Sequence, residues 1–212
     1  MISGHRSVLL FAVVSLLAVT LVAACSSGQV LKPDPAYLTP AAQTSTAASN
    51  AVPSAPKTKL QLASPAFTDN ASIPQKYTCD GEDKSPPLAI SGVSANAAGL
   101  ALIVTDLDGP GGNFVHWVVW NINPTTREIP EGAVPQVSVE GRNSLNGNSF
   151  AAPCPPTGVH HYVFELYALS QEVELGTAAG KGALLSEMNS HIIDQAQLTG
   201  TYTRATPGAI AP

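Results

Sequence analysis

Three apolar runs stand out along the middle of the chain, and each has the length and composition of a β-strand. Residues 100–104 (LALIV) are apolar without interruption, as expected for a strand that is covered on both faces. Residues 116–122 (HWVVWNI) and 161–169 (HYVFELYAL) combine aromatic and β-branched side chains. Pro- and Gly-rich turns separate the runs, among them DGPGG, NPTT, PEGAVP and NGN. The pattern predicts a domain built mainly from strands.

One stretch has helical periodicity. Within residues 181–196, apolar side chains recur at three- and four-residue steps, at Ala183, Leu184, Met188, Ile192 and Ala196. A last strand is expected over residues 199–204 (TGTYTR). Many strands followed by one late helix predict a mainly β fold, an antiparallel β-sandwich with one C-terminal helix.

The first residues have the character of an export signal. His5 and Arg6 precede Val8–Ala24, which is apolar except for Ser15 and Thr20. This segment ends in VAAC, and the order resembles a bacterial lipobox, in which the cysteine is diacylated after cleavage. We therefore expect a lipoprotein signal peptide over residues 1–24 and a lipid on Cys25, which places the protein at the cell membrane on its extracytoplasmic face. The alternatives are an uncleaved transmembrane anchor and ordinary secretion.

The next segment separates this signal from the domain. Residues 25–59 are rich in Ala, Thr, Ser and Pro and have almost nothing to bury, which is typical of a disordered tether. The folded domain is expected over residues 60–212. Cleavage after residue 24 leaves nine basic against fifteen acidic residues, a net charge of about −6. This charge argues against nucleic acid as a partner and against electrostatic attraction to anionic lipids.

Two further cysteines, Cys79 and Cys154, fall inside the expected domain. An exported protein meets an oxidising compartment, so we favour a disulfide between them. It would close a loop of roughly 75 residues and contribute about 4 kcal/mol to stability. Two free thiols and a catalytic thiolate are the alternatives.

Polar and special residues concentrate at the ends of the predicted strands. Asp106 and Asp108 follow residues 100–104 and would share a face if the chain stays extended there. In the stretch 153–164 (PCPPTGVHHYVF), strand alternation puts His160 and Tyr162 on one face and His161 on the other. A zinc site of Asp106, His116 and His160 is permissible, but no local ligand spacing supports it, and we predict no metal. There is no GxSxG elbow for a serine hydrolase. Satisfied histidines and turn-capping aspartates are the structural alternative.

The ordered motifs CDGEDKSPPL, Asp106-x-Asp108-Gly-Pro, HWVVWNI, GRN, PCPPTGxHHYVFELYAL and TGTYTR resemble the phosphatidylethanolamine-binding protein family. They are most similar to its exported bacterial branch, the Raf-kinase-inhibitor-like proteins. The resemblance runs from about residue 60 to residue 204 and implies a β-sandwich with a small pocket for phosphate or a phospholipid headgroup. Carried onto this sequence, the pocket residues are Asp106, Asp108, Pro110, His116, Pro155, Pro156, His160 and Tyr162.

The function we favour is a membrane-anchored binding protein, and the resemblance alone implies that it modulates a kinase or a protease. We expect no cofactor and no catalytic residue. No activated nucleophile is visible, which favours binding over two alternatives. One is a hydrolase in which Asp106 orients His116 or His160 as general base, and the other is an adaptor lipoprotein with a vestigial pocket. The sequence departs from the family pattern at Leu107, where a proline is usual, and at residues 149–152 (SFAA), where the family has glycines and a tyrosine. Both departures are expected to reshape the pocket wall.

Overall fold

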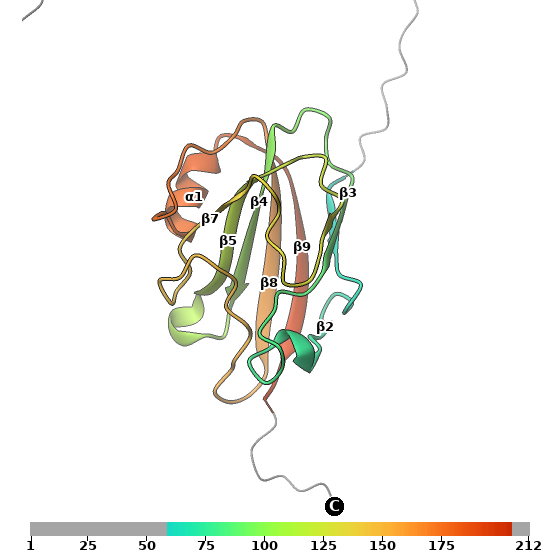
Figure 1. The fold of residues 1–212 in the computed structure, drawn as a ribbon, viewed down its shortest axis with the longest axis vertical. Coiled ribbons are helices and arrows are strands. Elements are labelled where there is room, and N and C mark those ends of the chain that lie inside the picture. Colours follow the sequence, from blue (N-terminus) through green and yellow to red (C-terminus); the bar gives the residue numbers. More distant parts are fainter. Residues whose placement is uncertain (1–58, 205–212) are drawn as a thin grey trace, which may run out of the picture. The chain divides into compact units, whose positions relative to one another are not determined.

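The computed structural model describes residues 59–204 as one β domain made of two sheets (Figure 1). The three-stranded sheet has the order β1 (Gln61–Ala63), β3 (Leu88–Ser91), β6 (Glu128–Ile129). The six-stranded sheet has the order β2 (Ala71–Ser72), β9 (Ile192–Tyr202), β8 (His160–Leu169), β4 (Gly99–Asp106), β5 (Phe114–Ile122), β7 (Val139–Glu140). One α-helix, α1 (Lys181–Met188), and two short 3-10 helices, η1 (Gln75–Tyr77) and η2 (Pro110–Gly112), complete the fold.

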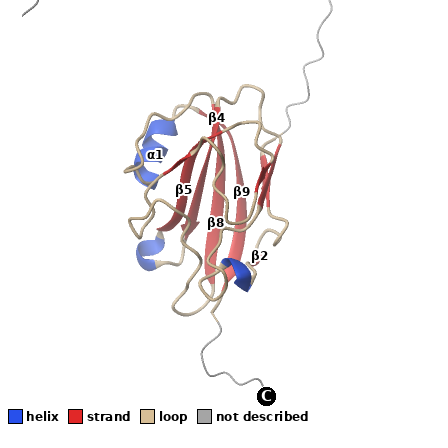
Figure 2. Ribbon diagram, viewed as in Figure 1, coloured by secondary structure: helices blue, strands red, loops and turns tan. Residues whose placement is uncertain are grey.

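The central strand β4 is covered on both faces, as its unbroken apolar run predicts. All of its residues are buried. Even-numbered side chains such as Leu102 and Val104 enter the core between the two sheets. Odd-numbered side chains such as Ile103 pack into a second core that includes Leu184 and Met188 of α1. Figure 2 shows the strands at the centre of the domain with α1 outside the larger sheet. The predicted strands over 100–104, 116–122 and 161–169 are all confirmed.

The larger sheet is mixed, so the expected antiparallel sandwich is correct only in outline. The short strand β2 runs parallel to β9, with Ala71 beside Gly200 and Ser72 beside Thr201. Its neighbours Asn70 and Ile73 donate their N–H groups to the carbonyl oxygens of Thr199 and Thr201. Two residues are too few to leave a hydrophobic pattern, so the sequence gives no signal for this pairing.

The predicted helix over residues 181–196 is too long. The helix ends at Met188, and β9 begins at Ile192, where half-buried and exposed residues alternate. Side chains four residues apart lie on the same face of a helix, about one turn apart, and also on the same face of a strand, where the pattern repeats every two residues. Met188, Ile192 and Ala196 therefore satisfy both patterns, and pairing with β8 decides for the strand.

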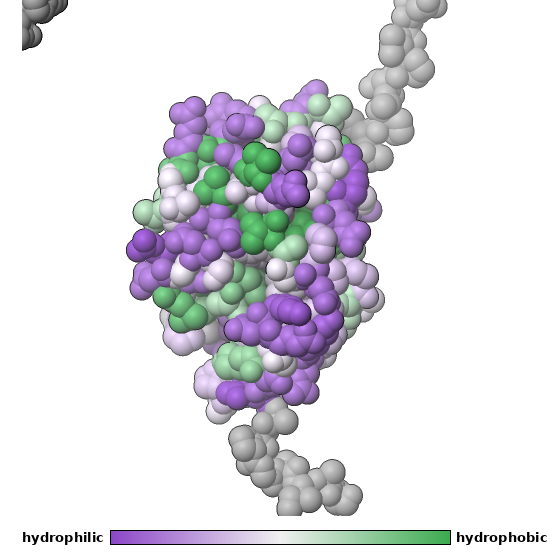
Figure 3. Space-filling model, in the orientation of Figure 1, coloured by the Kyte–Doolittle hydropathy of each residue, from purple (hydrophilic) through white to green (hydrophobic). Residues whose placement is uncertain are grey.

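The first described residues join the domain at one end of β9. The N–H group of Leu60 donates to Oδ2 of Asp194, 2.7 Å away, near the start of this strand. At its other end, Tyr202 pairs with His160, the first residue of β8. On the face drawn in Figure 3, hydrophobic residues gather in small clusters separated by hydrophilic ones. Within residues 59–204, no helix has the length and apolar character needed to cross a membrane.

Candidate functional site

The candidate site forms where three strands of the larger sheet meet at one end. Asp106 is the last residue of β4, and it pairs with Phe114 at the start of β5 and with Tyr162 near the start of β8. Because β4 lies between β5 and β8, this end brings four predicted residues together. We call Asp106, His116, His160 and Tyr162 the polar cluster.

A β-bulge turns His116 into the cluster. Val104 pairs with Trp117, whereas the next residue, Thr105, pairs with Val115, so His116 is the extra residue on β5. A bulge lets two consecutive side chains lie on the same side of a sheet and is common beside functional sites. His116 and Trp117 are accordingly both buried. The His116 ring meets the Tyr162 ring edge-on, with centroids 5.2 Å apart.

Asp106 and His160 form a buried pair. Nδ1 of His160 lies 2.7 Å from Oδ2 of Asp106, and because a carboxylate only accepts, Nδ1 carries the proton. The other carboxylate oxygen, Oδ1, accepts the backbone N–H group of Asp108 at 2.9 Å. Asp106 and His160 are 4% and 7% exposed. His160 and Tyr162 are buried and His161 is exposed, as strand alternation predicts.

Asp108 does not share a face with Asp106, because the chain leaves the strand after Asp106. The Asp108 carboxylate turns outward, and its Oδ2 accepts the backbone N–H group and the Nδ1–H group of His161, both at 2.8 Å. These hydrogen bonds, the side-chain one first, lower the pKa of Asp108. The pair lies at the surface, with both side chains more than two-fifths exposed. The structure thus separates Asp108 from the polar cluster.

His116 is held by Ala151, which lies in the segment 149–152 where the sequence departs from the family pattern. Its Nδ1 lies 2.6 Å from the carbonyl oxygen of Ala151, and the N–H group of Ala151 donates back to the carbonyl oxygen of His116 at 2.9 Å. A carbonyl only accepts, so Nδ1 carries the proton. Burial lowers the pKa of His116 and keeps the ring neutral. Its Nε2 is therefore a bare lone pair, 4.0 Å from Oδ2 of Asp106.

Two buried polar atoms of the cluster have no hydrogen-bond partner among the described residues, namely Nε2 of His116 and the hydroxyl of Tyr162. Burial first, and then the nearby Asp106 charge, raise the pKa of Tyr162, so its hydroxyl keeps its proton. Although Asp106 is close enough to act on this pKa, the two groups do not reach hydrogen-bond geometry. Buried polar groups are almost always paired in native proteins. Two unpaired atoms on neighbouring rings, whose centroids are 5.2 Å apart, indicate a place where a ligand supplies the partners.

A disulfide bond fastens the chain segment that contacts His116, the wall of the site formed by residues 151–154. Cys79 and Cys154 form the predicted disulfide, with their Cα atoms 5.4 Å apart. The N–H group of Cys79 also donates to the carbonyl oxygen of Pro153, at 3.1 Å. Two positions before Pro153, Ala151 contacts His116, so the disulfide fastens the segment that fixes the imidazole.

The predicted prolines frame this end of the sheet without joining the polar cluster. Pro155 is buried, while Pro110 and Pro156 are exposed on the flanking loops. Sequence reasoning missed two close neighbours of the cluster. Phe114 stacks at a tilt on His116, with ring centroids 4.9 Å apart. Gly109 packs so closely that a Cβ atom there would lie 3.1 Å from Oδ2 of Asp106. The motif DGPGG contained this glycine, but it indicated only a turn.

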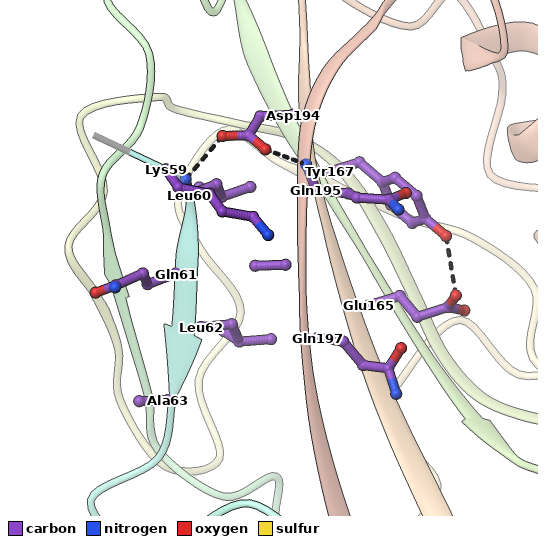
Figure 4. Close-up of a pocket in the computed structure, with 11 residues that line it drawn as sticks. Lys59, Leu60, Gln61, Leu62, Ala63, Glu165, Tyr167, Asp194, Gln195 and Gln197 are labelled. Carbon is purple, nitrogen blue, oxygen red and sulfur yellow. Dashed lines mark hydrogen bonds between the residues drawn. The ribbon is translucent and has the colours of Figure 1, made fainter. Parts of the chain in front are cut away.

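Other features of the domain lie apart from the cluster. Among residues 59–204, no group of three or more His, Cys, Asp or Glu side chains is arranged to hold a metal ion. A groove of about 670 Å³ runs between β1 and β9, and Figure 4 shows Lys59, Glu165, Tyr167 and Gln197 around it. No predicted site residue lines this groove. Cys25, the predicted signal and nearly all of the predicted tether lie outside the described residues.

The fold and the site together define a class of protein. Residues 59–204 form a two-sheet β domain with one α-helix and a buried His–Asp–Tyr cluster at one end of the larger sheet. The family model described as "Phosphatidylethanolamine-binding protein" matches residues 63–203. The chain belongs to the phosphatidylethanolamine-binding protein family, which confirms the family predicted from the sequence.

Similar proteins come from archaea and bacteria. A "UPF0098 protein" of Methanothermobacter thermautotrophicus is 42% identical over 150 residues, which are 68% of this chain and 99% of the relative. A putative phosphatidylethanolamine-binding protein homologue from Chlamydia trachomatis has a crystal structure with a TM-score of 0.67 and 38% identity. The match covers 70% of this chain and 99% of that one. The structure of Escherichia coli YbcL has a TM-score of 0.65 and 27% identity, over 69% of this chain and 99% of YbcL.

Proposed function

We propose that the polar cluster binds a small phosphate-bearing ligand, either a dissolved phosphate compound or a phospholipid headgroup. We further propose that the protein is exported and held at the cell membrane by a lipid on Cys25. Membership of a family named for phosphatidylethanolamine binding supports the ligand class. The low exposure of the cluster side chains restricts the bound part to a small group.

The observation that carries this proposal is the pair of unpartnered buried atoms, Nε2 of His116 and the hydroxyl of Tyr162. An unmade hydrogen bond in a buried site costs about 1–3 kcal/mol, which a ligand with matching groups recovers on binding. The hydrolase alternative with His116 as general base would need Asp106 to orient this imidazole. In the structure the Ala151 carbonyl instead holds its Nδ1, and the Asp106 carboxylate lies 4.0 Å from its Nε2.

Binding is tested by NMR titration of the folded domain with inorganic phosphate and with phosphoethanolamine. We expect the imidazole signals of His116 and His160 to shift and saturate together. In the double variant His116→Ala and His160→Ala, the ring signals of Tyr162, which shift in the wild-type protein, should no longer respond to ligand. The control is His161→Ala, because this exposed histidine contacts Asp108 outside the polar cluster and its loss leaves the titration unchanged. If both cluster imidazoles stay undisturbed at saturating ligand, the proposal is wrong.

The membrane anchor is tested on the full chain expressed in a bacterial host. The apolar segment Val8–Ala24 directly before Cys25 supports it. We expect mass spectrometry to find a diacylated cysteine at the mature N-terminus, and the protein to enter the detergent phase on phase separation. Cys25→Ser removes the lipid, so that variant is not processed at this position. An unlipidated wild-type N-terminus, or one that still begins at Met1, contradicts the anchor.

A further inference from the structure

The polar cluster is richer in hydrogen-bond acceptors than an anion site normally is. Its acceptors are the Asp106 carboxylate, the bare Nε2 of His116 and Nε2 of His160, whose Nδ1–H group donates to Asp106, and its free donor is the Tyr162 hydroxyl. We propose that the site takes a phosphate that carries its own proton, a phosphomonoester monoanion or dihydrogen phosphate, and rejects sulfate and other oxyanions without a proton. This inference rests on the proposed function and narrows its ligand to dissolved phosphate compounds and monoester headgroups, because the phosphodiester of phosphatidylethanolamine has no P–OH group.

The tautomer of His116 determines which groups its Nε2 atom can bind. Its Nδ1–H group is already used by the Ala151 carbonyl at 2.6 Å, so Nε2 offers a lone pair rather than a proton. A fully deprotonated oxygen facing Nε2 would meet a lone pair and be repelled. An oxygen that bears hydrogen would donate to it.

The Asp106 carboxylate determines which anions can enter the polar cluster. Asp106 is buried, and its Oδ2 lies 2.7 Å from Nδ1 of His160 and 4.0 Å from Nε2 of His116. The proton on Nδ1 of His160 is therefore directed at Asp106 and is not offered to a ligand. An anion beside this carboxylate experiences charge repulsion unless one of its oxygens donates a hydrogen bond to it.

The Lys and Arg salt bridges of residues 59–204 do not include the polar cluster. Sites for dianions commonly use Arg or Lys side chains. Among residues 59–204, every Lys or Arg salt bridge lies elsewhere, with Glu131, Glu82, Glu165 or Asp80 as partner. The other charged pair near the site, Asp108 with His161, is turned to the surface. Nothing in this arrangement favours a second negative charge on the ligand.

A protonated phosphate fits all three features. Its P–OH group donates to Nε2 of His116 or to Asp106, and one of its remaining oxygens accepts the Tyr162 hydroxyl. Sulfate has the same shape and is dianionic at neutral pH without a proton to donate. A phosphodiester has the charge of the monoanion but lacks the hydroxyl. Sulfate therefore tests the need for the proton at the same molecular shape, and the phosphodiester tests it at the same charge.

The test is calorimetric titration of the folded protein with methyl phosphate, sulfate and dimethyl phosphate between pH 6 and pH 8 at constant ionic strength. Methyl phosphate loses its last proton near pH ~6, so its dissociation constant should rise about tenfold per pH unit above that value. Sulfate and dimethyl phosphate should bind on the order of 10- to 100-fold more weakly at pH 6, because they leave a buried acceptor unpaired. Asp106→Asn, whose amide can donate, should reduce the preference for methyl phosphate over sulfate.

The outcomes are distinct. If sulfate binds as tightly as methyl phosphate, the inference is overturned and the proposed function stands. The inference is also overturned if sulfate and methyl phosphate gain affinity in parallel as the pH falls. Protonation of His116, and not of the ligand, would then explain the pH dependence. If dimethyl phosphate or glycerophosphoethanolamine binds as tightly as methyl phosphate, the phosphate hydroxyl is not the donor. If none of these ions binds, the proposed function itself fails.

Discussion

The Nδ1–H group of His116 donates to the carbonyl oxygen of Ala151, and this bond decides what the other ring nitrogen can do. The two residues lie 35 positions apart in the sequence, and the segment with Ala151 is fastened by the disulfide between Cys79 and Cys154. We therefore expect the orientation of this imidazole to depend on the disulfide, although the two do not touch.

Breaking this disulfide should weaken both the fold and the site. The double substitution Cys79→Ser and Cys154→Ser removes a bridge between residues 75 positions apart. We expect the free energy of unfolding to fall by about 4 kcal/mol, because the unfolded chain is no longer cross-linked. Phosphate affinity should fall as well, since the wall that orients His116 loosens. Urea denaturation and calorimetry measure the two effects, and reduction of the wild-type protein should reproduce them. Unchanged affinity in a folded variant would show that the wall holds without the bridge.

Tyr162→Phe should separate stability from binding. The hydroxyl of Tyr162 is buried without a partner, so its removal is expected to stabilise the free protein by about 1 kcal/mol. The same change removes the donor to the ligand and weakens phosphate binding. The matched control is Tyr167→Phe, in the same strand, because that hydroxyl donates to Oε1 of Glu165 at 3.1 Å. Thermal unfolding with and without phosphate gives both quantities. A loss of stability in Tyr162→Phe would mean that the hydroxyl is paired in solution.

His116 should make the fold less stable in mild acid. Burial lowers its pKa in the folded protein below the ordinary 6.5, whereas the unfolded chain keeps that value. As the pH falls below about 6.5, the unfolded state binds more protons and the free energy of unfolding decreases. His116→Asn keeps an N–H group near Ala151 and does not titrate, so its stability should depend less on pH between 7 and 5. Urea denaturation at both values makes the comparison, and identical pH dependence in the two proteins would contradict it.

Gly109→Ala should damage the site through crowding. The backbone there, at φ −68°, accepts alanine, but the new Cβ atom would lie 2.7 Å from Cβ of Phe114 and 3.1 Å from Oδ2 of Asp106. We expect a loss of about 1–3 kcal/mol in stability and weaker phosphate binding. Gly176→Ala is the control, because a Cβ atom there meets nothing within 4 Å. If the two variants behave alike, the space beside Asp106 is not restricted.

The sequence predicted the features that depend on runs of side chains. The buried strands, the single helix and the alternation that separates His160 from His161 all follow from hydrophobic periodicity. The resemblance supplied the four residues of the polar cluster.

Features that depend on which strands pair, and in which register, were not predictable from the sequence. The bulge at His116 exists only in the register between β4 and β5, and Ala151 acts through its backbone, which any residue type would provide. The outward turn of Asp108 likewise depends on where β4 ends. A single sequence carries no signal for these contacts.

The length of β9 separates the polar cluster from the point where the chain enters the domain. The chain enters the domain beside Asp194, whereas the polar cluster lies at the end of the strand where Tyr202 pairs with His160. Eight residues of strand separate the two points by about 26 Å. Within residues 59–204, a ligand at the polar cluster and the point where the chain enters the domain therefore lie at opposite ends of the longest strand.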